Sequence, residues 1–100
     1  MLIHAVYLWL KEESDAALRA EFAADCRALL AIPHIAQGWV GTPASTRDQV
    51  IDHSYEQALM LHFADLAAHD AYQEHPLHHA FVARYLPHFA QVKVYDMESA

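Results

Sequence analysis

The stretch LIHAVYLWL, residues 2–10, is rich in aliphatic and aromatic side chains and predicts a β-strand. Successive side chains of a strand point to opposite faces, so these nine residues divide into two sets. One set is Leu2, His4, Val6, Leu8 and Leu10, and the other is Ile3, Ala5, Tyr7 and Trp9. Both sets are mainly apolar, so we expect this strand to be covered on both faces.

Three further strands are predicted over residues 35–42, 55–63 and 92–97. In the second of these, YEQALMLHF, the alternation of side chains favours a strand although its Ala, Leu and Met content is typical of a helix. The polar, turn-rich segment 43–54 before it is expected to be a loop.

Helices are predicted between the strands. We expect Ser14 to be the N-cap of a helix that runs to about Leu30 and has Asp15 in its first turn. Apolar residues recur along it at helical spacing: Leu18, Phe22, Cys26, Leu29 and Leu30. Two shorter helices follow, one capped by Asp65 and running to about Gln73, the other with Pro76 in its first turn and running to about Arg84.

This order of elements, β-α-β-β-α-β, predicts an α+β domain over residues 1–100 with a ferredoxin-like, four-stranded antiparallel sheet and helices on one face. An uncovered face with Tyr7, Trp9 and Met60 exceeds the apolar patch that a monomer usually exposes. We therefore expect a homodimer in which two open sheet faces pair and enclose a barrel-like interior.

The composition excludes several classes of partner. Thirteen acidic and six scattered basic residues give a net charge of −7, which disfavours binding to nucleic acid or to an anionic membrane. No apolar run reaches the roughly 18 residues of a membrane span, and the first strand lacks the features of a signal peptide, so a cytoplasmic protein is expected. The only cysteine, Cys26, is expected to be a buried apolar residue.

The most specific motif is YQEHPLHHAFV, residues 72–82. Together with His4 in the first strand and the sequence VYD at residues 94–96, it resembles the stress-responsive dimeric A/B barrel (Dabb) family over nearly the whole chain. The resemblance implies a ferredoxin-like fold and a dimeric barrel. Most bacterial members of that family have no assigned reaction.

One branch of the family, the plant polyketide cyclases of the olivetolic acid cyclase type, closes a linear poly-β-ketone by aldol chemistry without a cofactor. The resemblance implies that Tyr72 and His78 are the catalytic pair and that His4 is a pocket histidine. A second pocket histidine of these cyclases falls at about Gln57 here, so this part of their site is not matched.

An aldol closure needs a base for an acidic C–H proton and a donor for the oxygen that becomes anionic. His78 is predicted in the first helical turn after Pro76, where the helix dipole favours the neutral imidazole that a base requires. The hydroxyl of Tyr72 could donate a hydrogen bond to the enolate oxygen. An apolar wall for a hydrophobic substrate is predicted from Val6, Leu8, Phe22, Leu59 and Leu61.

Each of these polar residues also has a structural interpretation. His78 and Tyr72 could simply pack, and His4 could be a core histidine with a satisfied hydrogen bond. His75, a candidate substrate contact, could instead cap the helix that follows it. Asp96 could orient a histidine or accept a backbone hydrogen bond at the end of its strand.

No chemistry is predicted for the other histidines. His75 and His79 are four residues apart, but no third ligand completes a metal site, so we expect neither a metal nor a cofactor. His62 is expected to meet the dimer partner. Solvation is the expectation for the histidines near loops and helix surfaces: His34, His53, His69 and His88.

Three functions follow as alternatives. The first is a protein that binds a small hydrophobic molecule in the cleft between sheet and helices. The second is a cofactor-independent cyclase or lyase that uses Tyr72 and His78. The third, by analogy of fold alone, is an oxygenase or a haem-handling protein.

Overall fold

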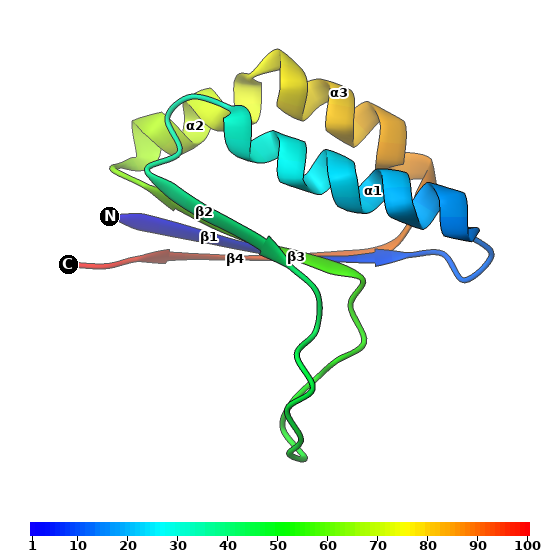
Figure 1. The fold of residues 1–100 in the computed structure, drawn as a ribbon. Coiled ribbons are helices and arrows are strands. Elements are labelled where there is room, and N and C mark those ends of the chain that lie inside the picture. The colour runs from blue at the N-terminus through cyan, green and yellow to red at the C-terminus, as the bar shows by residue number, and fades with distance from the viewer.

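Four strands form one antiparallel sheet, and all the helices lie on one of its faces (Figure 1). The computed structural model describes residues 1–100. The strands lie side by side in the order β2-β3-β1-β4. The elements are β1 (Leu2–Leu10), α1 (Ala16–Ala28), η1 (Leu29–Ala31), β2 (Gln37–Gly41), β3 (Gln57–Phe63), α2 (Leu66–Glu74), α3 (Pro76–Tyr85), η2 (Leu86–His88) and β4 (Phe89–Glu98). The predicted ferredoxin-like arrangement is thereby confirmed.

The strand boundaries differ from prediction according to how each strand pairs. β1 has its predicted bounds and lies between β3 and β4. β2 is an edge strand that pairs only with β3, over five residue pairs, and it is shorter than the predicted segment. β4 is longer than predicted, because it pairs with β1 along nearly its whole length, from Leu2↔Glu98 to Leu10↔Phe89.

The helices begin at side-chain caps. The Asp15 carboxylate accepts a hydrogen bond from the Leu18 backbone N–H at 2.8 Å, so Asp15 is the N-cap of α1 and the prediction of Ser14 was wrong by one residue. Asp65 caps α2 as predicted, by accepting from the Ala68 backbone N–H at 2.9 Å. Such caps satisfy backbone donors that have no partner inside the helix.

The core lies between the sheet and the helices. Phe22 and Cys26 of α1 are fully buried, as are Leu61 and Phe63 of β3. The predicted burial of Cys26 is therefore confirmed. Burial raises the pKa of the Cys26 thiol to about 12.

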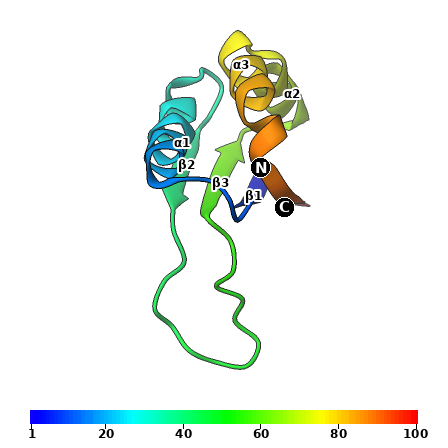
Figure 2. The same cartoon turned by 90° about the vertical axis from the view of Figure 1, so that its right-hand side faces the viewer.

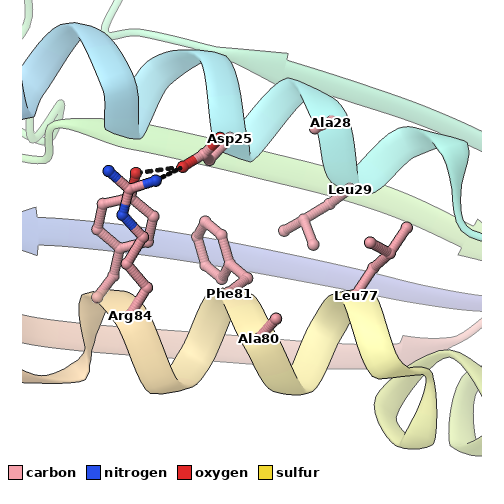
Figure 3. Close-up of a pocket in the computed structure, with 8 residues that line it drawn as sticks. Asp25, Ala28, Leu29, Leu77, Ala80, Phe81 and Arg84 are labelled. Atoms are coloured by element: carbon pink, nitrogen blue, oxygen red, sulfur yellow. Dashed lines mark hydrogen bonds and ion pairs between the residues drawn. The ribbon is translucent and has the colours of Figure 1, made fainter.

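The helices α1 and α3 run antiparallel across the sheet, with a small hollow of about 210 Å³ between them (Figure 3). At one end of this hollow the Asp25 carboxylate accepts hydrogen bonds from the Arg84 guanidinium at 2.9 Å and from the Tyr85 hydroxyl at 2.5 Å. These bonds tie the two helices together.

Strand β2 passes close beneath the end of α1. A Cβ atom at Gly38 would lie 2.7 Å from Leu30 Cδ2 and 2.9 Å from Leu61 Cδ2, whereas a Cβ atom at Gly41 would meet nothing within 4 Å. Gly38 therefore permits a close approach that a larger residue would prevent.

The other face of the sheet carries no helix, and only the loop between β2 and β3 extends below it (Figures 1 and 2). Four large apolar side chains on this open face are exposed: Trp39, Met60, Tyr95 and Met97. No helix of the chain is long and apolar enough to cross a membrane.

Candidate functional site

A cavity of about 390 Å³ lies between the helix-facing side of the sheet and helices α2 and α3. This volume falls within the range of about 300–1,000 Å³ that is usual for small-molecule sites. Eleven of its fifteen lining residues are hydrophobic. The lining comprises His4, Val6, Leu8, Leu29, Leu59, Tyr72, Gln73, His78, Phe81, Val82, Leu86, Phe89, Val92, Val94 and Asp96.

The bend between α2 and α3 brings Tyr72 and His78 together. Pro76 stands at the start of α3, and His75 caps that helix because its Nδ1 accepts a hydrogen bond from the Leu77 backbone N–H at 3.1 Å. His78 therefore lies in the first turn, as predicted. Its ring centroid is 4.9 Å from that of Tyr72, and the two rings meet edge to face.

Burial sets the protonation states of this pair. Loss of solvent lowers the pKa of His78, and the neighbouring His79 and His4 lower it further, against the opposing effects of the nearby Gln73 backbone and of Glu74. His78 Nδ1 is buried and has no hydrogen-bond partner. Burial also raises the pKa of the Tyr72 hydroxyl to about 12. The pair is thus a neutral imidazole next to a neutral phenol, which is the state required for a base and a hydrogen-bond donor.

His4 is the third polar residue of the cavity, and Asp96 holds it. The two residues are direct neighbours across β1 and β4, and His4 Nδ1 lies 2.5 Å from Asp96 Oδ1. Burial lowers the pKa of His4, while the Asp96 carboxylate opposes this shift. Of the two roles considered for Asp96, the structure has the one in which the carboxylate orients a histidine.

His69 of α2 also contacts this group. Its ring centroid lies 4.9 Å from that of His4, and its side chain is only 12% exposed. The expectation that His69 is solvated was therefore wrong, because α2 places this residue over β1 instead of toward water.

Most of the predicted site residues come together in the cavity, and four do not. Tyr72, His78, His4, Val6, Leu8 and Leu59 all line it. Phe22 lies outside, since it is packed among Phe81, Tyr85 and Phe89 in the core.

The other three predicted residues outside the lining have different surroundings. Leu61 is fully buried in β3, directly opposite Gly38 of β2. Gln57 is buried next to Leu8, and its Oε1 has no partner. The Nδ1 of His75 caps α3. It is therefore not free to bind a metal ion together with His79.

Several lining residues were missed, although the sequence carries signals for them. Val92, Val94 and Asp96 alternate along β4 on the same face as His4, once the strand pairing is known. Phe81 and Val82 follow His78 at three and four residues, so they lie on the same side of α3. A helical period started from His78 would have found them.

An antiparallel sheet of this topology, with its helices on one face and a cavity between the two layers, defines a ferredoxin-like α+β protein. The family model described as the stress responsive A/B barrel domain (Dabb) matches residues 2–99. The chain therefore belongs to the Dabb family, as its motif suggested. No curated protein matches it.

Solved structures support the same fold. A Dabb family protein with a ferredoxin-like fold from Mesorhizobium loti has a TM-score of 0.79 and 28% identity, over 99% of this chain and 96% of that one. A dimeric ferredoxin-like protein of unknown function from Jannaschia has a TM-score of 0.76 and 25% identity, over 98% of each chain. The hydroxynitrile lyase of Passiflora edulis has a TM-score of 0.80 and 17% identity, over 99% of this chain and 93% of that one.

Proposed function

We propose that this protein binds a small hydrophobic molecule in the cavity between the sheet and helices α2 and α3. The observation that carries the proposal is the cavity itself, about 390 Å³ with a mainly apolar lining and a few polar groups. Pockets with this division bury the apolar part of a ligand and fix its orientation through the polar groups. Here the polar side chains of the lining are His4, Tyr72, Gln73, His78 and Asp96.

The test is native mass spectrometry of the freshly purified protein, followed by denaturation of the same sample to release and weigh any bound organic molecule. Binding of the apolar fluorescent probe 1-anilinonaphthalene-8-sulfonate gives a second readout. Val6→Phe places a larger side chain in the cavity and is expected to reduce probe affinity at least tenfold. Val50→Phe, in a loop where Val50 is 89% exposed, is the matched control and should leave affinity unchanged. Equal probe binding by both variants would contradict this location.

A second candidate function is cofactor-independent proton transfer of the aldol or lyase type. The close contact of Tyr72 with a neutral, half-buried His78 favours it. The imidazole would take a proton from carbon between two carbonyl groups, and the phenol would donate a hydrogen bond to the resulting enolate. The enolate carbon would then bond to a second carbonyl carbon of the same substrate molecule, and the oxygen of that carbonyl takes up a proton. The hydroxynitrile lyase with this fold supports including a lyase among the candidates.

The assay for this candidate uses linear poly-β-ketones with apolar tails. His78→Ala is expected to lower turnover by roughly 10²–10⁴-fold, the usual contribution of a general base. Tyr72→Phe tests the hydroxyl alone. His79→Ala changes the adjacent histidine, whose side chain is 61% exposed, and should retain activity. Undiminished turnover in His78→Ala would rule out its role as base.

We further propose that the chain forms a homodimer through its open sheet face. The exposed apolar side chains of that face support this, as does the dimeric description of the Jannaschia structure. The oxygenase or haem-handling alternative stays a prediction, and a haem titration followed at the Soret band would test it.

A further inference from the structure

Two imidazoles and one carboxylate converge at the edge of the cavity from three separate elements. His4 lies on β1, His69 on α2 and Asp96 on β4, and one ligand atom of each lies within 4.8 Å of the others. These residues are distant in the sequence, so the cluster is a product of the tertiary fold. Only His4 and Asp96 of the three line the cavity, and His69 approaches from outside its lining.

The cluster is buried at its two histidines and open to solvent at its aspartate. His4 is 3% exposed and the His69 side chain 12% exposed, while the Asp96 side chain on the edge strand is 46% exposed. An ion could therefore enter from solvent past Asp96 and reach the two imidazoles.

A neighbouring carboxylate orients His69. Asp70 Oδ1 lies 3.0 Å from His69 Nδ1 and selects the tautomer with its proton on that nitrogen, so that Nε2 carries a lone pair. Histidines that bind metals commonly donate their second ring nitrogen to a carboxylate in this manner. Gln73 Nε2 now lies 3.3 Å from His69 Nε2 and would give way to an ion.

We propose that His4, His69 and Asp96 form a binding site for a divalent first-row transition-metal ion such as Zn²⁺. Two imidazoles and a carboxylate are ligands that these ions prefer, and three protein ligands leave a coordination position open. This site goes beyond the proposed binding of a hydrophobic molecule and does not depend on it.

The present separations need only small side-chain movements to fit an ion. Bond lengths of about 2.0–2.2 Å place the ligand atoms of a tetrahedral site about 3.3 Å apart. The contact between His4 Nδ1 and Asp96 Oδ1 would open from 2.5 Å, and the wider separations, all within 4.8 Å, would close. Asp96 can move because its side chain is half-exposed on an edge strand. Tyr72, whose ring centroid is 6.1 Å from that of His4, would lie next to the bound ion.

The experiment uses the full chain without a histidine tag, stripped with a chelator and dialysed into metal-free buffer. Calorimetric titration with Zn²⁺ should give one ion per chain. Titration with Co²⁺ should give visible d–d bands of a four- or five-coordinate nitrogen and oxygen site. His69→Ala and Asp96→Asn are each expected to weaken Zn²⁺ binding at least tenfold.

Two control variants make the result specific. His53→Ala removes an exposed loop histidine, and His78→Ala removes the proposed base; both should retain Zn²⁺ affinity. A His78→Ala protein that binds Zn²⁺ but has lost turnover would separate the two proposals. Circular dichroism establishes that each variant is folded. The metal site is overturned if wild type shows no saturable binding of Zn²⁺ or Co²⁺, or if both ligand variants bind as wild type does. It is equally overturned if His53→Ala loses as much affinity as they do.

Discussion

His78 loses contact with water when it packs against Tyr72 in the first turn of α3, and this burial is the main reason that its pKa is lowered. The groups that face it from α2, α3 and β1 are Tyr72, the Gln73 backbone, Glu74, His79 and His4. Since the folded protein holds this imidazole below its ordinary pKa of about 6.5, His78 binds a proton less readily in the folded than in the unfolded chain.

The consequence is a loss of stability at acidic pH. Between the lowered folded pKa and the unfolded value, the unfolded chain binds more protons, so the free energy of unfolding falls as the pH falls through that interval. One proton of difference changes it by about 1.4 kcal/mol per pH unit. Urea denaturation at a series of pH values should show this slope in wild type and a smaller slope in His78→Gln.

His4, whose pKa is also lowered by burial, accounts for the slope that remains in His78→Gln. His53→Gln is the control, because that histidine is exposed in the loop between β2 and β3 and does not shift the pKa of His78. A slope in His78→Gln equal to that of wild type would show that His78 does not titrate as its environment requires.

Individual residues of the site differ in how far the sequence could reveal them. Tyr72 and His78 belong to a recognisable motif, and His4 follows from the alternation of β1. His69 was missed because its assignment depends on where a nine-residue helix sits over the sheet, which no local pattern records. The Asp96 contact likewise depends on the register between β1 and β4.

Among the secondary-structure elements, the N-cap of α1 can be tested by substituting each of two neighbouring residues. Asp15→Ala removes the hydrogen bond to the Leu18 backbone N–H and should reduce the free energy of unfolding by about 0.5–2 kcal/mol. Ser14→Ala should change it by less than about 0.5 kcal/mol, as is usual for substitutions away from such features. Urea denaturation measures both. A larger effect at Ser14 than at Asp15 would restore the original prediction of the cap.

The two glycines of β2 form a similar pair. Gly38→Ala should cost about 1–3 kcal/mol through overpacking, because its Cβ would press on Leu30 and the fully buried Leu61. Gly41→Ala meets open space and should change the free energy of unfolding by less than about 0.5 kcal/mol. Thermal unfolding of both variants is the measurement, and equal stability of the two would refute the close approach.

Element types were easier to predict than their ends. The alternation of β1 and β3 is strong enough to identify both strands. The ends of β2 and β4 depend on whether a neighbouring strand continues alongside, and that is a property of the assembled sheet. Asp15 and Ser14 are both common caps, so composition alone could not choose between them.

For the whole molecule, the open sheet face gives a prediction about assembly. Tyr95 is 60% exposed on that face, and its replacement by a charged residue, Tyr95→Asp, should convert a dimer to a monomer at micromolar concentration. Leu66→Asp is the control, because Leu66 is similarly exposed but lies on α2. Sedimentation velocity distinguishes the species. A monomeric wild type, or equal dissociation of both variants, would contradict pairing through this face.

The fully buried sulfur of Cys26 has a consequence for redox biology. With a pKa of about 12, its reactive thiolate makes up only about 10⁻⁵ of the population at neutral pH. Peroxides and alkylating agents would reach this thiol only when the core opens. The rate at which Cys26 is labelled therefore measures how often the core opens. The buried thiol of Cys26 is therefore poorly suited to act as a redox sensor.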